Sequence, residues 1–220
     1  MKAEMLVIMG PVGSGKGTVI QRLTEKHPSY RAVDTGEILR KKAREGGPVS
    51  EEIRQYLDKG LLVPDELVAR ILEEEIASLR KDSEVFLLDG FPRNLQQIPL
   101  LEGILERLNI TLKGVYWLEL SEEQAQERMR YRRVCSQCGA IYHLKNLPPK
   151  VEGICDRCGG SLVARKDDVP EIIHQRWKVY KEHTQPVCEW YKRKGLLFCV
   201  DASGTPDDVV QQIGIRQEEP

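Results

Sequence analysis

A glycine-rich stretch near the start of the chain has the composition of a phosphate-binding loop. It runs Gly10-Pro-Val-Gly-Ser-Gly-Lys-Gly-Thr18, after a short apolar run and before a segment that suits a helix, Thr18–Glu25. Glycines let the backbone fold around a phosphate with its N–H groups pointing inward, and a helix N-terminus favours negative charge. Lys16 can reach a phosphoryl group that is being transferred. The hydroxyl that usually follows this lysine directly stands one place later, at Thr18.

Four of the six cysteines form two CxxC pairs with the spacing of a metal site. Cys135 and Cys138 are followed, after 16 residues, by Cys155 and Cys158. This spacing is typical of four-cysteine zinc sites, in which four thiolates leave no open position for catalysis. A segment of roughly 40 residues with few large apolar side chains needs such a cross-link to fold. We therefore expect a structural zinc, with free thiols or a redox pair as the alternatives.

A carboxylate and two arginines stand in loops next to expected strand ends. Asp89 closes the apolar run LLD, and the carboxyl ends of parallel strands are where open α/β sheets bind ligands. A carboxylate there can hold the water shell of Mg²⁺ beside phosphates, although it could also simply cap the turn before Pro92. Arg40 and Arg93 offer planar guanidinium groups that suit a phosphate monoester.

The elements that must position these residues alternate along the chain. Pro64–Leu79 and Pro170–Lys194 favour helices, and Pro186 should kink or break the second. Such alternation with buried apolar runs predicts an α/β P-loop fold of three layers with a five-stranded parallel sheet. The expected strands are Met5–Met9, Ala32–Val33, Val85–Leu88, Val115–Leu120 and Leu196–Val200. Two segments interrupt the alternation: residues 34–63, polar and mostly helical, and residues 131–168, rich in Cys, Gly, Pro and Lys.

The composition limits the class of partner. Of 220 residues, 33 are Lys or Arg and 34 are Asp or Glu, so the formal net charge is −1. Nucleic-acid or anionic-membrane binding usually needs a basic surplus, and no stretch approaches the roughly 18 apolar residues of a membrane helix. The first residues lack the pattern of a signal peptide. We expect a cytoplasmic monomer without nucleic-acid or membrane partners, in a compartment where paired thiols favour metal over disulfide.

Seven stretches, taken in order, resemble the adenylate kinase family over nearly the whole chain. They are GPVGSGKGT, DTGEILR, GLLVPDE, LLDGFPR, RRVCSQCG, LVARKDD and HQR. The resemblance implies reversible Mg²⁺-dependent phosphoryl transfer from ATP to AMP, giving two ADP. It also implies a core of residues 1–33, 64–130 and 169–220, a helical AMP-binding segment at 34–63 and a zinc-ribbon-like lid at 131–168. Closure of the lid would exclude water, which competes with AMP as a nucleophile.

The resemblance also assigns site residues. The ATP-binding set would be Gly13, Ser14, Gly15, Lys16, Gly17, Thr18, Arg128, Arg132, Ile141, Tyr142 and, through its carbonyl, Thr205. The AMP-binding set would be Thr35, Arg40, Leu61, Leu62, Val63, Gly90, Arg93, Gln97, Arg165 and Arg176. The catalytic set would be Lys16, Asp89, Arg93, Arg132, Arg165 and Arg176. The chain departs from the family where Asp34-Thr-Gly-Glu37 replaces the usual Ser-Thr-Gly-Asp, and where Thr205 replaces a common lysine.

Three alternatives stay open at this point. The chain could be a P-loop kinase for another nucleoside monophosphate, although Gln97 and the long lid favour AMP. It could be a zinc ribbon that binds nucleic acid, for which RMRYRR at 128–133 is the best support. It could also be a nucleotide-binding regulator without catalysis, although Lys16, Asp89 and the arginine set argue for an enzyme.

Overall fold

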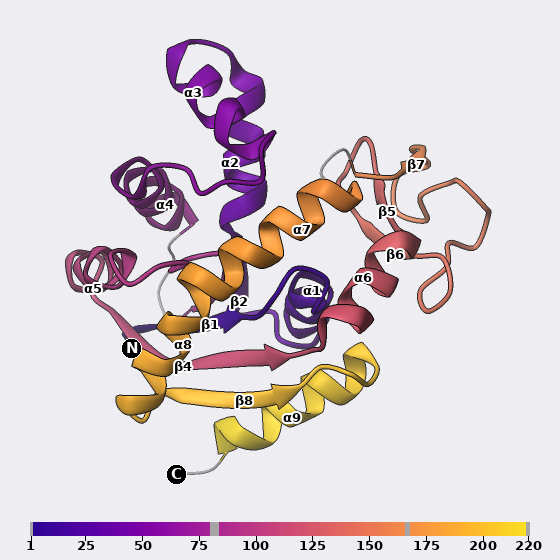
Figure 1. Cartoon of the computed structure of the whole chain (residues 1–220). Helices are drawn as coiled ribbons and strands as arrows, with labels where there is room; N and C mark the ends of the chain where they lie inside the picture. Colours follow the sequence, from indigo (N-terminus) through magenta and orange to yellow (C-terminus); the bar gives the residue numbers. More distant parts are fainter. Residues whose placement is uncertain (1, 80–83, 166–167, 219–220) are drawn as a thin grey trace.

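A five-stranded parallel sheet forms the centre of the molecule (Figure 1). The computed structural model describes residues 2–79, 84–165 and 168–218, so Lys166 and Asp167 of the LVARKDD stretch lie outside the described residues. The strand order is β2-β3-β1-β4-β8, and every neighbouring pair is parallel. The strands are β1 Ala3–Met9, β2 Tyr30–Asp34, β3 Val85–Asp89, β4 Ile110–Glu119 and β8 Leu197–Asp201.

The predicted α/β class and the five-stranded parallel sheet are confirmed. Each of the five apolar runs coincides with a strand to within two residues at its ends, except that β4 begins earlier than expected, at Ile110. Ile110 pairs with Ala3, so the first half of β4 follows β1 from its start. This half is less apolar than Val115–Leu120, and therefore the sequence pattern alone did not indicate it.

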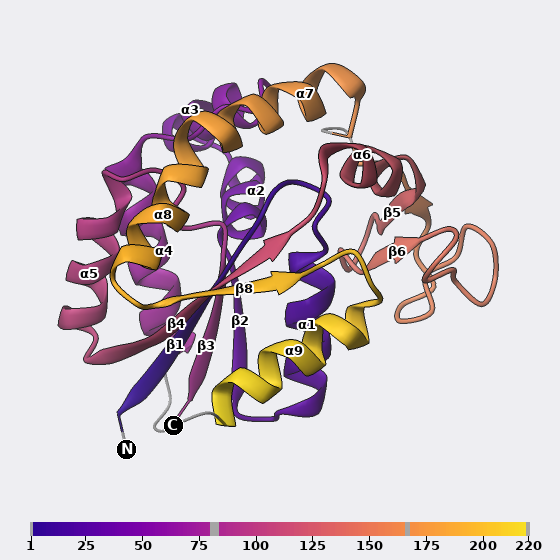
Figure 2. The ribbon, with the colours of Figure 1, turned by 60° about the horizontal axis from the view of Figure 1, so that its bottom comes forward.

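Helices cover both faces of the sheet and produce the three layers (Figure 2). One face carries α1 (Lys16–Lys26) and α9 (Pro206–Glu218), whereas the other carries α4 (Asp65–Leu79), α5 (Gln97–Arg107) and α8 (Gln185–Arg193). Side chains of the central strand β1 point alternately to the two faces of the sheet. Leu6 and Ile8 pack in the cluster with α1 and α9, whereas Met5 and Val7 pack in the cluster with α4, α5 and α8. A strand buried on both sides must be apolar throughout, which explains the continuous run.

The long helix predicted over Pro170–Lys194 is interrupted, as Pro186 suggested. It consists of α7 (Pro170–Val179), the π-helical turn η1 (Tyr180–Thr184) and α8, in which Pro186 is the second residue. Proline lacks the N–H that would donate to the preceding turn, and it is tolerated at the start of a helix for that reason. The π-helical turn ends immediately before the proline, where the Gln185 N–H donates to the carbonyl of Tyr180, five residues back.

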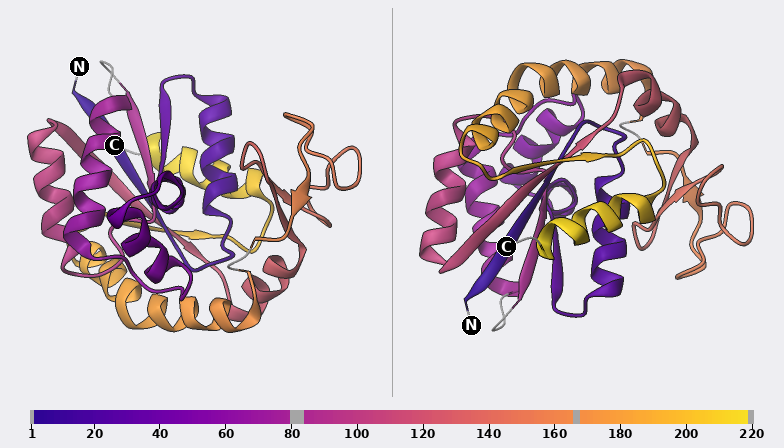
Figure 3. Two further views of the ribbon diagram at one scale, coloured as in Figure 1. Left: turned by 90° about the horizontal axis from the view of Figure 1, so that it is seen from above. Right: turned by 90° about the horizontal axis from the view of Figure 1, so that it is seen from below.

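The two interrupting segments differ in structure. Residues 34–63, called here the helical segment, contain α2 (Thr35–Glu45) and α3 (Pro48–Leu57). Residues 131–168, called here the cysteine segment, follow α6 (Glu122–Tyr131) and form a small antiparallel sheet in the order β6-β5-β7. Its strands are β5 Arg132–Cys135, β6 Ile141–His143 and β7 Leu162–Val163. Figure 3 shows that the cysteine segment projects away from the central sheet and its helices.

The helices of the molecule are short or carry charged residues along their length. Across residues 2–79, 84–165 and 168–218, none is long and apolar enough to cross a bilayer.

Candidate active site

A cavity lies where the central strands end and the helical segment begins. Its walls come from β1, the P-loop, β3 with the loop that follows it, α2, and the α7–η1 helix. Backbone and apolar atoms of Leu61, Leu62 and Val63 close one side. The polar side chains that line it are Lys16, Thr35, Arg40, Asp89, Arg93, Gln97, Arg176, Tyr180 and Thr184. The structure therefore gathers in one place most of the residues that the sequence assigned to phosphoryl transfer and AMP binding.

The P-loop is held in shape by its own contacts. Gly13 has φ 85°, and a Cβ at this position would lie 2.9 Å from the carbonyl oxygen of Ala125, so only glycine fits. Ser14 donates its hydroxyl to the carbonyl of Pro11 at 2.8 Å. The Lys16 ammonium donates to the carbonyls of Gly10 and Pro11 at 2.9 and 3.0 Å. This cage keeps the charged end of Lys16 at the mouth of the loop, where phosphates would bind.

Lys16 and Asp89 perturb each other across the cavity. Burial lowers the pKa of Lys16 to about 8, and the nearby Asp89 carboxylate opposes that shift. Burial likewise raises the pKa of Asp89, and Lys16 opposes it. With a pKa of about 8, Lys16 stays mostly protonated at neutral pH. The cavity therefore presents a desolvated cation to an incoming anion, which strengthens their attraction.

Asp89 fits the role of a magnesium-linked carboxylate. It is the last residue of β3, it is buried, and its Oδ1 has no hydrogen-bond partner among the described residues. Buried carboxylate oxygens normally accept hydrogen bonds. An oxygen without a donor at the wall of a cavity therefore indicates that a ligand supplies the donor. The waters around a Mg²⁺ ion would supply the missing donors.

The entry to the helical segment explains the departure at Asp34. The Asp34 side chain accepts the Glu37 N–H at 2.9 Å and so caps the N-terminus of α2, a function that serine performs equally well. Asp34 also pairs with Asp89 across β2 and β3, which places a second negative charge near the cavity. Glu37 forms ion pairs with Arg40 at 3.0 Å and Arg44 at 3.2 Å. Thr35 is 3% exposed, and its hydroxyl has no partner within the described structure.

The loop after β3 is fixed from several directions. The Arg93 side chain donates through Nε to the carbonyl of Gly90 at 2.9 Å. Its backbone N–H donates to the Gln97 side-chain oxygen at 2.7 Å. Thr184 of η1 donates its hydroxyl to the Arg93 carbonyl at 2.9 Å. The guanidinium group of Arg93 therefore belongs to an ordered loop at the cavity wall.

Thr184 and Tyr180 are site residues that the sequence did not indicate. Both belong to η1 and line the cavity. Tyr180 accepts a hydrogen bond from the Trp117 indole at 2.7 Å, which ties η1 to β4. The break at Pro186 was the only sequence signal near them, and π-turns are frequent at functional sites.

Asp168, which the sequence also did not indicate, binds Arg132 and lies close to Arg176. Asp168 has a side chain that is 3% exposed and receives both Nε and Nη2 of Arg132, the Nε bond being 2.7 Å long. Arg176 lies 4.0 Å from the same carboxylate. A bidentate pair fixes the plane of a guanidinium group. Asp168 thus connects the cysteine segment to α7. It is the last residue of the LVARKDD stretch, three positions after Arg165, and that position was the available sequence signal.

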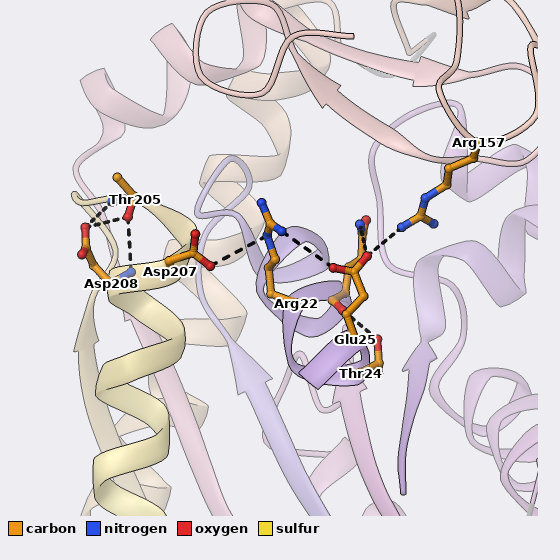
Figure 4. A network of polar contacts seen from close by, with 8 residues as sticks. Arg22, Thr24, Glu25, Arg157, Thr205, Asp207 and Asp208 are labelled. Atoms are coloured by element: carbon orange, nitrogen blue, oxygen red, sulfur yellow. Dashed lines mark hydrogen bonds and ion pairs between the residues drawn. The ribbon is translucent and has the colours of Figure 1, made fainter. Parts of the chain in front are cut away.

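Several expected ATP-binding side chains do not line this cavity. Arg128 donates to the carbonyl oxygens of Ala202, Ser203 and Gly204 and so holds the loop before α9. Thr205 caps α9 through Asp208, and Figure 4 shows this pair. Ile141 lies beside the P-loop, with Cδ1 3.1 Å from where a Gly17 Cβ would be. Arg132, and Arg165 of the expected AMP-binding set, also lie outside the cavity lining.

Tyr142 is turned away from the P-loop, unlike its neighbour Ile141. Its ring is 6% exposed and packs in the cysteine segment with Cys135 and Cys155. Its hydroxyl accepts the Asp156 N–H at 2.7 Å and lies 3.5 Å from the Cys155 sulfur. The hydrogen bond with Tyr142 lowers the pKa of the Cys155 thiol to about 6. The Tyr142 side chain therefore packs against the cysteine cluster in this structure, and its predicted contact with ATP stays a prediction.

The four cysteines converge on one point. Their sulfur atoms all lie within 4.8 Å of one another, with 3.4 Å between Cys135 and Cys158 and 3.6 Å between Cys138 and Cys155. A tetrahedral zinc with Zn–S bonds of about 2.3 Å requires S–S distances of about 3.8 Å. The four thiol groups and their spacing therefore fit a tetrahedral zinc site.

The two CxxC turns have the same backbone pattern. Gly139 donates to the Cys135 carbonyl at 3.1 Å, and Gly159 donates to the Cys155 carbonyl at 2.9 Å. In each turn the first cysteine N–H donates to a carbonyl five residues on, that of Ala140 or Gly160. Two matching turns that present four sulfurs are the arrangement typical of zinc ribbons.

The cysteine segment also touches the central domain at its surface. Arg157, between the last two cysteines, lies 3.1 Å from Glu25 of α1. Figure 4 shows Glu25 between Arg157 and Arg22, and Arg22 in turn faces Asp207 of α9. All four side chains are at least one-third exposed, so solvent weakens each of these ion pairs.

Sequence comparison with known proteins finds relatives of one family over most of the chain. A sequence model described as adenylate kinase matches residues 8–196. The chain is 42% identical to an adenylate kinase of Carboxydothermus hydrogenoformans, over 94% of this chain and 96% of the relative. It is 40% identical to adenylate kinases of Archaeoglobus fulgidus and Clostridium tetani, in each case over 94% of this chain and 95% of the relative.

Proposed function

The chain belongs to the adenylate kinase family and transfers a phosphoryl group between ATP and AMP, and we propose that the cavity around Lys16, Asp89 and Arg93 is where the transfer occurs. The observation that carries this proposal is the convergence of one lysine, one buried carboxylate and three arginines on a single cavity. Two anionic nucleotides repel each other, and fixed positive charge is what brings them together.

The proposed division of the site follows its walls. ATP phosphates bind along the P-loop from Gly13 to Thr18, with Lys16 at the transferred group. The AMP phosphate binds Arg40 and Arg93, and its base lies against Leu61–Val63 and Gln97. The cavity lining supports the AMP part of this assignment, because it includes Arg40, Arg93, Leu61–Val63 and Gln97. Arg132, Arg165 and Arg176 approach the phosphates from the cysteine segment and α7.

The chain's own residues can account for the transfer without a general base. An AMP phosphate oxygen attacks the γ-phosphorus as the bond to the ADP oxygen breaks, and the attacking oxygen is already ionised. Lys16 and the arginines hold both nucleotides in line and offset the charge on the moving group. Asp89 would hold Mg²⁺ through its water shell, and the ion, when bound with ATP, neutralises phosphate charge.

We further propose that the domains act as the sequence suggested. Residues 1–33, 64–130 and 169–220 form the core, residues 34–63 bind AMP, and residues 131–168 act as a zinc-stabilised lid that closes over ATP and excludes water. Support comes from the four-sulfur cluster and from Asp168, which connects this segment to Arg176. We also infer a monomer in the cytoplasm, as composition and paired thiols led us to expect.

The first test is ADP formation from Mg-ATP with AMP, GMP, CMP and UMP in parallel. Activity with AMP alone supports the proposed acceptor, whereas a preference for another monophosphate would keep the mechanism and change the substrate. The Lys16→Ala variant should lower kcat by about 10²–10³-fold, because it removes a preorganised charge from the transferred group. Lys26→Ala, at the exposed end of the same helix, is the matched control. Near-normal kcat for Lys16→Ala would contradict the proposed site.

A further inference from the structure

Gln97 is held by hydrogen bonds at both ends of its side-chain amide. Its Oε1 accepts the Arg93 backbone N–H at 2.7 Å, and its Nε2 donates to Asp65 Oδ1 at 2.6 Å. Asn94 also donates to both Asp65 oxygens, at 2.9 and 3.1 Å. Gln97 is only 2% exposed and lines the cavity. Its amide is therefore a fixed group in the wall of the proposed AMP site.

The partners leave only one orientation open to this amide. The Asp65 carboxylate can only accept hydrogen bonds, and the Arg93 N–H can only donate one. If the amide turned over, its oxygen would face the carboxylate and its NH₂ would face the N–H. Both hydrogen bonds would be lost, and two pairs of like dipoles would oppose each other in a buried place. Asp65 is also the first residue of α4, where the helix N-terminus favours a negative charge.

We propose that Asp65 is a positioning residue that sets the base preference of the enzyme by fixing the Gln97 amide. Each amide end has one hydrogen-bonding position left after the contacts described above. Adenine presents an amino donor beside a ring acceptor, so the amide must offer an acceptor and a donor in that order. A 6-oxopurine presents the reverse pattern and needs the amide turned over. The inference rests on the proposed AMP site and adds Asp65, from outside the expected site, to it.

The Asp65→Asn variant tests this inference, since it keeps the shape and removes the acceptor-only property. An asparagine amide can face either end of the Gln97 amide with a suitable group. The preference for AMP over IMP, measured as the ratio of their kcat/KM values, should fall about tenfold or more, while KM for ATP stays within twofold. Glu66→Gln is the matched control, because it removes the neighbouring, exposed charge from the same helix turn.

Two outcomes would count against the inference, and they are distinguishable. An unchanged AMP/IMP ratio in Asp65→Asn, whatever happens to the melting temperature, would show that Asp65 only stabilises α4. A Gln97→Ala variant with an unchanged KM for AMP would show that the base binds elsewhere, and the proposed AMP site would then fail first. A lowered ratio in Asp65→Asn, together with a raised KM for AMP in Gln97→Ala, supports both.

Discussion

The helical segment and the cysteine segment are stabilised in different ways. Each is an excursion of 30–40 residues from the central sheet, too small to form a core of its own. The helical segment joins its apolar side chains to the main core, since Leu39, Ala43, Ile53 and Val63 belong to the same buried cluster as strands β1 and β3. Its stability is therefore part of the stability of the whole domain.

The cysteine segment does not have that connection. Its buried cluster is separate and contains Cys135, Ala140, Tyr142 and Cys155, with Leu162 beside it, so two of its four buried members are sulfur donors. Several of its large apolar side chains stay exposed, among them Val151 at 57% and Ile154 at 46%. A segment that buries so little must obtain its folding free energy from another source, and metal binding is the available one.

The largest effect is expected from removing the zinc that we propose for the cysteine segment. Zinc supplies on the order of 10–16 kcal/mol in isolated fingers, so Cys155→Ser, or chelation, should unfold residues 131–168 and leave the central domain folded. Limited proteolysis should then cut within this segment, and zinc content measured in parallel should fall. Cys199→Ala, a thiol outside the cluster, is the control. If the cysteine segment of zinc-free protein still resists protease, its folding does not depend on zinc, and the two segments would not differ in how they are stabilised.

Truncation in the helical segment should instead lower global stability. Ile53 is completely buried in the main cluster, and Ile53→Ala should reduce the free energy of unfolding by about 2–5 kcal/mol. Urea unfolding followed by circular dichroism measures this, and zinc content should not change. Val49→Ala, at an exposed position one turn before on α3, serves as the control. Loss of only the helical segment, with an unchanged main transition, would argue that its packing is independent of the core.

A smaller effect is expected where α3 closes the end of α2. The Ser50 hydroxyl lies 2.7 Å from the Lys42 carbonyl and 2.8 Å from that of Gly46, and it supplies the donor that a helix C-terminus lacks. Ser50→Ala should lower the free energy of unfolding by about 1–2 kcal/mol, because it removes a buried donor from partly buried hydrogen bonds. The same urea titration detects it, and Ser50→Thr should recover part of the loss. A variant as stable as wild type would mean that water replaces the hydroxyl.

The smallest effect should come from the ion pair between the segment and the core. Arg157 and Glu25 are about half exposed, and exposed pairs contribute about 0.2–1 kcal/mol. A double-mutant cycle with Arg157→Ala and Glu25→Ala should give a coupling energy in that range that vanishes at high salt. A coupling well above this range would mean that the cysteine segment depends on the core for its folding, as the helical segment does.

The sequence alone determined the chemistry and the order of elements. Glycine spacing around Lys16, the paired cysteines and the apolar runs each depend on neighbours within about 20 residues, and such local patterns survive without a structure. They were sufficient for the fold class and, with the family resemblance, for the reaction. The expected AMP-binding residues that line the cavity, such as Arg40 and Gln97, were also named from sequence motifs.

The tertiary structure decided which of those residues act on one another. Asp65 and Gln97 are 32 positions apart, Arg132 and Asp168 are 36 apart, and Thr184 lies 91 positions from Arg93. No local periodicity predicts such contacts, because they depend on how α4, η1 and the cysteine segment pack around β3. Packing also turned the Tyr142 ring towards the cysteines while Ile141 remained beside the P-loop. Local spacing therefore fixed the types of chemistry, and long-range packing fixed the orientation of the groups that perform it.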